Sequence, residues 1–442
     1  MPRISREHLA RVEGHGAIEV AIDGEAVREV KVRLFEGARL FEALLVGRRY
    51  DEVTSVAMRI CAICSAGHTV TSLKAIEKAF GLRVSPQTEL LRELLFLGQM
   101  IESHALHVFC LALPDYLGYA GALPLAADHP EEVKLGLWLK KVGNAIQEEI
   151  GGRAVHPVNA VVGGFGRLPS QEALRRLQGL LEEAVEQSDR VVALMKSLQT
   201  PDFCQSPNVY VALRPEGGRF GFFGETIVTS TGETKPVSAY REVCGEEVVR
   251  HSHAKQSRLA GKPFMVGALA RLSLHGHLLG GRARAAMDQL LRLPSQNILD
   301  NNAAQAVELI FSLERALAIV KHLLAEGLVE EKPVAVVPRA GTGTAATEVP
   351  RGTLYHSYTF DQQGYLVAAD IVTPTAQNSA NMEKDVRAAT ERLLAGLPLD
   401  QIGDRLEMVI RAYDPCISCA VHLLDLRGAS AAVEVLAPGE EA

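Results

Sequence analysis

Three features are scarce in this sequence, and each scarcity excludes a class of protein. Its 442 residues carry a formal charge of -7 and no cluster of Lys and Arg, so we expect neither a nucleic-acid binder nor a binder of anionic membranes. The opening residues, MPRISREHLARVEGHG, contain no apolar core, so we expect no signal peptide and a cytoplasmic protein. The most apolar stretch, residues 104–127, is interrupted by two prolines and an aspartate, so we expect no membrane span.

Cysteines are also few, seven in the whole chain. Without a signal peptide they favour reduced thiols with a metal or redox role over a disulfide framework. The composition, 47% hydrophobic and 22% charged, is typical of a globular protein. No internal repeat, low-complexity tract or Ser/Pro-rich linker divides the chain. The economical interpretation is one mostly helical globule.

Hydrophobic periodicity predicts a mainly α (α+β) fold with five long helices. Pro114 is expected to end the first of them, and Ser170 to cap the third. The predicted helices cover residues 88–113, 130–150, 170–199, 302–327 and 380–395.

Small sheets are expected at the periphery of these helices. Apolar and polar residues alternate over 17–34 around Asp23-Gly24, which is a strong hairpin signal. A short helix is expected between this hairpin and the first cysteine pair. Turn signals at Glu216-Gly217-Gly218, Thr231-Gly232 and Gln363-Gly364 predict further hairpins within 208–245 and 353–372.

Two Cys-x-x-Cys pairs are the most informative feature that is present. Cys61 and Cys64 lie near the start, Cys416 and Cys419 lie near the end, and a histidine follows each pair. Thiolates bind nickel, iron, zinc and copper(I). Two matched pairs therefore predict a metal centre built where the two ends of the chain meet.

Three other interpretations of the pairs remain open on spacing alone. A structural zinc site usually has its pairs about 15–20 residues apart, far closer than here. A thioredoxin-like dithiol would sit in a βαβ pattern, and neither pair does. An iron–sulfur cluster also takes four cysteines.

The surroundings of the cysteines resemble a known family. The motifs, in order, are RVEGHG (11–16), EGARLFE (36–42), GRRYDEVTSVAMRICAICSAGH (47–68), EVPRGTLYH (348–356), VTPTAQN (372–378) and DPCISCAVH (414–422). The chain resembles the large, catalytic subunit of nickel–iron hydrogenases, in particular the cytoplasmic branch linked to flavin or heterodisulfide partners. The resemblance runs almost end to end. It implies a central bundle of long helices with small peripheral sheets, and reversible oxidation of H2 to protons and electrons.

By this resemblance, nickel binds all four sulfurs. Cys61 and Cys416 would be terminal ligands, while Cys64 and Cys419 would bridge to an iron that carries CO and two cyanides. A Pro-Arg-Gly turn and a Pro-Thr turn would donate hydrogen bonds to the cyanides. The residues implied are Pro350, Arg351, Pro374 and Thr375.

The resemblance also assigns proton and support roles. Glu13 would take the proton from Cys416, Arg351 would lie over the open coordination site, and Asp414 would belong to the polar surroundings of the metals. His68 would hydrogen-bond a bridging sulfur. Without the resemblance, Glu13 is more often a solvated or capping carboxylate, and Arg351 is a surface loop arginine just as readily.

Glu42 and His422 would bind a magnesium or similar ion near the C-terminus. Ser103 stands where many relatives have an aspartate, which leaves the charge partner of Arg351 open. His104 and His107 share one helix face and are interpreted as packed, hydrogen-bonded histidines rather than ligands.

The resemblance divides the chain into a single domain over 1–422 and an extension over 423–442. A maturation endopeptidase would remove this extension by cutting between His422 and Leu423. The other cysteines, Cys110, Cys204 and Cys244, match no cluster motif, and no dinucleotide-binding Gly-x-Gly-x-x-Gly is present. An iron–sulfur small subunit and further electron-transfer subunits are therefore expected as partners.

Other functions compete with a hydrogenase. A hydrogen sensor would have the same centre with little turnover. The quinone-module subunit of respiratory complex I shares the fold but lacks the four cysteines. A structural zinc protein would contain zinc without nickel and iron.

Overall fold

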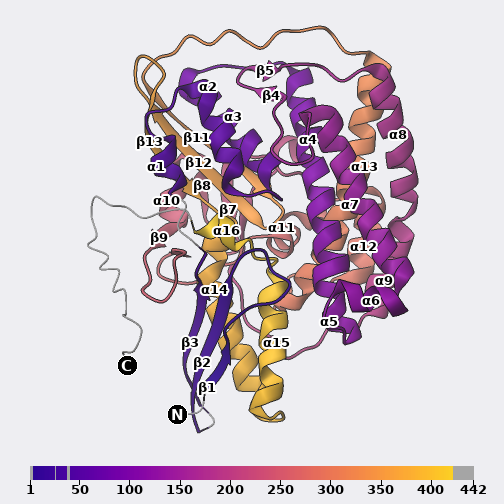
Figure 1. Ribbon diagram of the computed structural model, residues 1–442, viewed down its shortest axis with the longest axis vertical. Helices are drawn as coiled ribbons and strands as arrows, with labels where there is room; N and C mark the ends of the chain where they lie inside the picture. Colours follow the sequence, from indigo (N-terminus) through magenta and orange to yellow (C-terminus); the bar gives the residue numbers. More distant parts are fainter. Residues whose placement is uncertain (1–2, 25, 37–39, 422–442) are drawn as a thin grey trace.

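Long helices pack side by side on one flank of the molecule in the computed structural model, which describes residues 3–24, 26–36 and 40–421 (Figure 1). Gly98 and Gly143 let two of these helices touch, because a Cβ on Gly143 would lie 2.4 Å from the Gly98 carbonyl oxygen. The long helices are α4 (Pro86–Leu106), α7 (Pro130–Gly151), α8 (Gln171–Glu186) and α13 (Asn301–Glu326). Shorter helices on this flank are α5 (Leu113–Leu117), α6 (Ala122–Asp128), α9 (Ser188–Ser197), α11 (Ala268–His275) and α12 (Gly281–Leu290).

Small antiparallel sheets lie beside the bundle. Two of the three-stranded sheets flank the meeting point of the chain ends: β1 (Arg3–Arg6), β2 (Gly16–Asp23) and β3 (Ala26–Leu34); and β11 (Gly341–Val349), β12 (Gly352–Phe360) and β13 (Leu366–Val372). The others are β4 (Ala160–Val161) with β5 (Gly164–Phe165), β6 (Val211–Leu213) with β7 (Thr226–Thr229) and β8 (Thr234–Pro236), and β9 (Gly245–Glu247) with β10 (Gln256–Arg258).

The remaining helices connect these sheets to the bundle. A buried contact between α3 and β11 requires glycine, because a Cβ on Gly343 would lie 2.0 Å from the Ala75 carbonyl oxygen. The helix α14 packs against β3 and β10. These helices are α1 (Phe41–Leu45), α2 (Tyr50–Ala57), α3 (Ser65–Phe80), α10 (Tyr240–Val243), α14 (Pro374–Leu393), α15 (Leu399–Ala412) and α16 (Ile417–Ala420).

The predicted mainly helical fold with small peripheral sheets is confirmed. In the first hairpin Ile18 pairs with Val32 and Val20 with Val30, and all four side chains are buried. The Ser170 hydroxyl caps α8 by accepting a hydrogen bond from the backbone N–H of Ala173.

Three helix boundaries differ from the prediction. Pro114 does not end the first helix: α4 runs into a π-helical turn, His107–Ala112, and then into α5. Pro114 is tolerated because it lies in the first turn of α5, where its missing N–H is not needed. The predicted helix 170–199 is divided at Gln187, whose N–H bonds the carbonyl of Ala184. The helix predicted at 380–395 already begins at Pro374.

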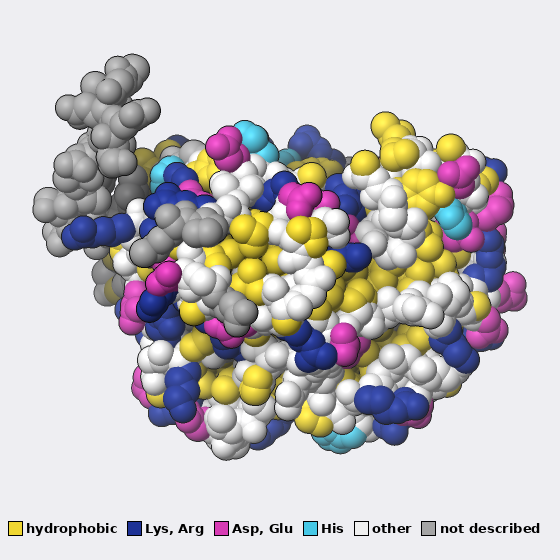
Figure 2. Space-filling view, turned by 90° about the horizontal axis from the view of Figure 1, so that it is seen from below, with side chains coloured by type: hydrophobic (Ala, Val, Ile, Leu, Met, Phe, Trp, Pro, Cys, Tyr) yellow, Lys and Arg dark blue, Asp and Glu magenta, His cyan; other side chains and the backbone are white. Residues whose placement is uncertain are grey.

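The continuous helical stretch Pro86–Leu117 is long and apolar enough to cross a membrane, with a mean hydropathy of 1.4. However, 89% of its most apolar window is buried inside the protein, as in a core helix. On the face seen in Figure 2, Lys and Arg side chains are interspersed with Asp and Glu. This pattern agrees with the absence of a basic cluster from the sequence.

Candidate metal centre

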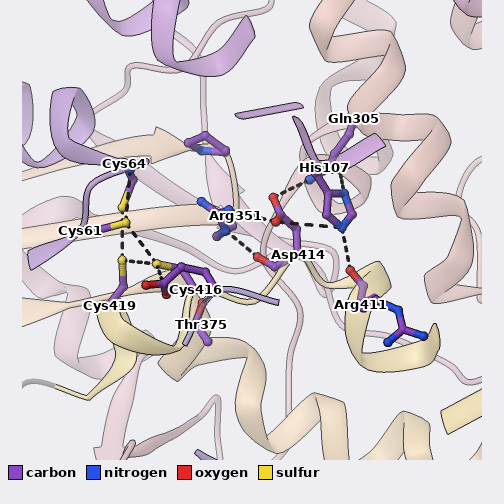
Figure 3. A network of polar contacts seen from close by, with 12 residues as sticks. Cys61, Cys64, His107, Gln305, Arg351, Thr375, Arg411, Asp414, Cys416 and Cys419 are labelled. Atoms are coloured by element: carbon purple, nitrogen blue, oxygen red, sulfur yellow. Dashed lines mark hydrogen bonds and ion pairs between the residues drawn. The ribbon is translucent and has the colours of Figure 1, made fainter. Parts of the chain in front are cut away.

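Four buried sulfurs meet where the N-terminal and C-terminal segments of the chain touch (Figure 3). Cys61 follows a 3₁₀ turn and Cys64 immediately precedes α3. Cys416 is the N-cap residue of α16, and Cys419 lies within that helix. The Cys61–Cys416 and Cys64–Cys419 sulfur distances are both 3.2 Å, and all four sulfurs lie within 4.8 Å of one another. These distances are too long for disulfides, and all four cysteines are free.

The segment around Glu13 fastens the C-terminal pair to the start of the chain. The backbone N–H of Ile417 donates to the carbonyl of Glu13 at 2.9 Å, and Glu13 and Cys416 form a parallel bridge. Gly14 has a φ of 86°, and a Cβ there would lie 2.7 Å from Cβ of Ile417. Glycine is required at this position by both conformation and space.

The Glu13 carboxylate contacts the centre directly. Cys416 Sγ lies within hydrogen-bonding distance of Oε2, at 3.1 Å, and the backbone N–H of Ser418 donates to the same oxygen at 3.0 Å. The Ser418 hydroxyl donates to Oε1. Burial, together with the negative charge of Cys416, raises the pKa of Glu13 to about 7. A carboxyl with such a pKa can both accept and release a proton near neutral pH.

The four thiols do not ionise equally. Hydrogen bonds from the neighbouring sulfurs lower the pKa of Cys61, and although burial opposes it, the hydrogen bond from Cys419 lowers that of Cys416. Burial raises the pKa of Cys64 and Cys419. Because a metal requires thiolates, binding would displace the remaining protons.

Arg351 lies in the turn between β11 and β12 and reaches toward the sulfurs (Figure 3). Its Nε donates to the carbonyl of Asp414 at 2.6 Å, and its Nη2 donates to the Asp414 carboxylate at 2.9 Å. Its Nη1 is buried and has no hydrogen-bond partner among the described residues. The sequence left the charge partner of Arg351 open, because Ser103 stands where many relatives have an aspartate. The structure shows that this partner is Asp414.

Asp414 is itself held from the bundle side. Its φ of 52° is left-handed, a conformation that Asp tolerates better than most residues. Gln305 Nε2 donates to its carboxylate at 3.2 Å. His107 Nδ1 lies 2.5 Å from Gln305 Oε1, and its Nε2 lies 2.8 Å from the carbonyl of Arg411. His107 is thus a hydrogen-bonded histidine, as interpreted from the sequence, and so is His104, 3.0 Å from Glu308.

Gln305 was not singled out from the sequence. The signal available was a run of polar side chains on an otherwise apolar helix, α13, whose first turns are fully buried. Buried polar groups require partners, so such a run marks a helix that faces something polar. The buried polar residues of this run are Asn301, Asn302, Gln305 and Glu308.

The two predicted proline turns lie beside the sulfurs in different ways. Thr375 Oγ1 accepts a hydrogen bond from the backbone N–H of Cys416 at 3.0 Å. Pro374 occupies the first turn of α14. Pro350 precedes Arg351 in the β11–β12 turn. His68, in α3, has its Nδ1 3.0 Å from Nε2 of His356; its predicted contact with a bridging sulfur stays a prediction.

Glu42 lies in α1 and is only 6% exposed. Its Oε1 accepts from the backbone N–H of Ile371 at 2.7 Å, whereas its Oε2 is buried without a hydrogen-bond partner in the described part of the chain. Burial raises the pKa of Glu42 to about 8. An orphaned carboxylate oxygen of this kind fits a bound cation. His422, its expected co-ligand, lies outside the described residues.

Comparisons with known proteins identify the same class throughout. Residues 39–141 and 221–422 match the family described as nickel-dependent hydrogenase. The chain is 39% identical to sulfhydrogenase 1 subunit alpha of Pyrococcus furiosus, over 96% of this chain and 98% of that protein. It is 27% identical to the NAD-reducing hydrogenase HoxS subunit beta of Cupriavidus necator, over 94% of each. Its fold matches a crystal structure of an NAD⁺-reducing [NiFe]-hydrogenase in the H2-reduced state, with a TM-score of 0.87 and 29% identity, covering 96% of this chain and 100% of that one.

Proposed function

Since this chain belongs to the nickel-dependent hydrogenase family and is the large, catalytic subunit of a nickel–iron hydrogenase, we propose that its four-cysteine centre is where H2 is split reversibly into protons and electrons. The observation that carries the proposal is the meeting of four buried sulfurs from both chain ends, within 4.8 Å of one another and beside the Glu13 carboxylate. Two sulfurs on one metal, each at about 2.3 Å, lie within about 4.6 Å of each other. The sulfur cluster therefore fits a soft metal such as nickel.

Nickel would be held by Cys61, Cys64, Cys416 and Cys419. The second and fourth of these would be shared with an iron that carries CO and two cyanides. When bound, this metal pair would supply a soft site that takes up the hydride, while a thiolate sulfur would supply the base for the proton.

The chain's own groups then move the proton. The Cys416 sulfur accepts it and passes it to Glu13 Oε2, 3.1 Å away. The pKa of Glu13, raised to about 7 by burial, supports this role, because the carboxylate can take the proton and the carboxylic acid can release it. Ser418 keeps the carboxylate aimed at the sulfur through its N–H and hydroxyl.

Arg351 would place a cationic N–H over the open coordination site. The unpartnered Nη1 supports this, since a buried guanidinium N–H is costly unless something else accepts its hydrogen bond. Asp414 fixes the side chain by accepting from Nε and Nη2. We assign Asp414 the orientation of Arg351 and not a direct contact with the substrate.

The cyanide ligands would be bound at the two proline turns, Pro350-Arg351 and Pro374-Thr375. The Thr375 hydroxyl accepts from the Cys416 N–H and keeps its own hydrogen to donate to a cyanide nitrogen. His68 would support a bridging sulfur from α3. Glu42 and His422 would hold a magnesium or similar ion, which the orphaned Oε2 of Glu42 favours.

Electrons must leave through other proteins. Cys110, Cys204 and Cys244 are buried singly, away from any shared cluster of the described residues. We propose an iron–sulfur small subunit as the direct acceptor and a further electron-transfer subunit behind it. A relative that is itself named as one subunit, beta, of an NAD-reducing hydrogenase supports a multi-subunit assembly. We also propose a cytoplasmic location, a single domain over 1–422, and removal of 423–442 by an endopeptidase, a cut that lies outside the described residues.

Infrared spectroscopy of the purified complex tests the metal assignment. We expect stretching bands of CO and cyanide and rapid reduction of an artificial dye by H2. The complex should contain nickel together with an excess of iron, because the proposed small subunit also carries iron. Zinc in place of nickel and iron would refute the proposal. Infrared bands with only slow dye reduction would instead identify a hydrogen sensor.

A further inference from the structure

The segment Met265–Leu272 (MVGALARL) has no role in the site as described so far, although it leads into α11 and contains Arg271. Arg271 is 1% exposed, and its side chain is among the largest that are fully buried in the described part of the chain. We propose that Arg271 is a positioning residue, which holds the Pro350-Arg351 turn and thereby the Arg351 guanidinium over the four-cysteine centre. This inference rests on the proposed function, because it requires Arg351 to act at that centre.

All five N–H groups of the Arg271 guanidinium have acceptors. Nε and Nη2 each donate to the carboxylate of Glu308 at 2.6 Å, and Nη1 donates to that of Glu348 at 3.0 Å. The two remaining N–H groups bind the turn itself, at the carbonyls of Val349 (3.1 Å) and Pro350 (3.0 Å). Arg271, Glu308 and Glu348 are called the Arg271 network below.

The two carboxylates of the network are fixed from several directions. Glu348 Oε1 accepts from the backbone N–H of Leu213 and from the Thr353 hydroxyl, both at 2.7 Å. Glu308 Oε2 lies 3.0 Å from His104 Nε2. The network therefore connects α4, α11 and α13 of the bundle with β6, β11 and β12. Its guanidinium cannot shift without breaking several buried hydrogen bonds at once.

The turn is also held against the start of α11 by close packing. Gly352 has a φ of 134°, and a Cβ there would lie 2.3 Å from Cγ2 of Val266. A Cβ on Gly267 would lie 3.3 Å from the Arg351 carbonyl oxygen. Arg351 is thus held by α11 behind it and by Asp414 in front of it, which leaves its guanidinium little freedom.

A lysine at position 271 would keep the charge and lose the geometry. Its single ammonium cannot bind two carboxylates and two carbonyls in one plane. We expect the turn to move, and misplacement of a reacting group by about 1 Å can cost about 100-fold in rate. A purely structural arginine would instead cost stability alone.

The test compares Arg271→Lys with Arg92→Lys in the complete complex. Arg92 is a matched control, because it is also buried, binds a carboxylate (Glu77) with two hydrogen bonds of 2.6 and 2.7 Å, and donates to one carbonyl. For both variants the readouts are melting temperature, nickel and iron content, the infrared bands, and dye reduction by H2 per nickel. Arg351→Lys is measured in parallel as the direct test of the proposed function.

We expect both control and test variants to melt at lower temperature. Only Arg271→Lys should lose turnover per nickel, by about 10- to 100-fold, and shift the cyanide bands. Unshifted bands and full turnover per nickel in Arg271→Lys would overturn the inference, while inactive Arg351→Lys would leave the proposed function standing. Full activity of Arg351→Lys would count against the proposed role of Arg351 itself.

Glu348→Gln decides the matter if Arg271→Lys does not accumulate as folded protein. Its amide oxygen can still accept from Leu213 and Thr353, so the local fold keeps two of its hydrogen bonds. Shifted cyanide bands with reduced turnover per nickel would support the positioning role. Bands and turnover identical to the unmodified enzyme would contradict it.

Discussion

The four-cysteine centre and the Arg271 network are both buried and charged, yet their polar atoms are satisfied differently. In the network every guanidinium N–H has an acceptor within 3.1 Å. At the centre, Arg351 leaves Nη1 without a partner among the described residues, and Glu42 in α1, the proposed magnesium ligand, leaves Oε2 without one. A buried unpaired polar atom costs about 1–3 kcal/mol. Among the unpaired buried atoms of the described residues, Arg351 Nη1 and Glu42 Oε2 belong to side chains proposed to face the open coordination site and to hold a magnesium or similar ion.

Cysteines inside and outside the centre can be compared in the same way. The largest expected loss of turnover follows from replacing a cysteine of the centre. Cys416→Ser replaces a soft thiolate of the centre with a hard hydroxyl that binds nickel poorly. Loss of a group behind a metal ligand already costs about 10- to 100-fold, so loss of the ligand should reduce turnover by more than about 100-fold. Nickel content by elemental analysis and dye reduction by H2 measure this.

Cys244→Ser is the control, because Cys244 is equally buried, donates to the carbonyl of Tyr240 and lies outside the four-sulfur cluster. A serine hydroxyl can make the same hydrogen bond. Nickel content and turnover should both stay at the level of the unmodified enzyme. Equal nickel loss in both variants would show that burial, and not ligation, governs metal retention.

Glu13→Gln should have the next largest effect, since it keeps the shape of the carboxyl and removes its ability to accept a proton. Positioned acid–base groups contribute about 10²- to 10⁴-fold to rate. We expect loss of that size in the exchange of hydrogen isotopes between H2 and D2O, with the cyanide and CO bands still present. The glutamine can still accept from the Ser418 N–H, so the fold should be retained.

Glu36→Gln is the control for Glu13. Glu36 lies in the same N-terminal region and accepts from the backbone N–H of His15 at 3.1 Å, but has no recorded contact with a sulfur of the centre. Its isotope exchange rate should be unchanged. Full exchange in Glu13→Gln would exclude this carboxylate from the proton path.

Thr375→Val removes a hydroxyl that supports the centre without contributing a sulfur. The Cys416 N–H would lose its acceptor, and a cyanide would lose its proposed donor. We expect a loss of about 10-fold in turnover per nickel and a shift of the cyanide bands. Thr390→Val, in the same helix, removes only a hydrogen bond to the carbonyl of Val386, so it should leave both unchanged.

The sequence predicted the helices, the first hairpin and the cysteine pairs, but it did not predict which buried side chains pair with one another. Local patterns carried the long helices, the first hairpin and the two cysteine pairs, because periodicity and ligand spacing are readable over short distances. The pairing of Arg351 with Asp414 and of Arg271 with Glu308 and Glu348 joins residues 37 to 77 positions apart. Nothing local distinguishes such an arginine from one in an exposed loop.

Boundaries were missed where tertiary packing overrides local signals. Pro114 is usually a helix stop, yet the π-helical turn before it lets the chain continue into α5. The polar start of α14, PTAQN, lacks apolar periodicity, because its side chains are buried against the sheet strands and the C-terminal pair rather than in an apolar core. Helices that face a polar site therefore escape an analysis based on hydrophobic spacing.

The smallest predicted effect concerns His275, a buried histidine close to the Arg271 network. His275 follows Arg271 by one turn of α11, and its Nε2 is buried without a partner among the described residues. Burial lowers the pKa of His275 from 6.5 to about 4. Below pH 6.5 the unfolded chain binds a proton that the folded chain resists, so stability present above pH 6.5 is lost as the pH falls toward 4.

Between pH 7 and pH 5 this loss should amount to about 2 kcal/mol in the unfolding free energy of the chain. His275→Gln, which cannot be protonated, should flatten that part of the stability profile, whereas His277→Gln at the exposed neighbouring histidine should not. Denaturant unfolding at several pH values measures both. A flattened profile with unchanged turnover per nickel would show that an unpaired buried atom outside the centre affects only folding. A change in turnover would instead extend the functional region along α11, one turn beyond the Arg271 network.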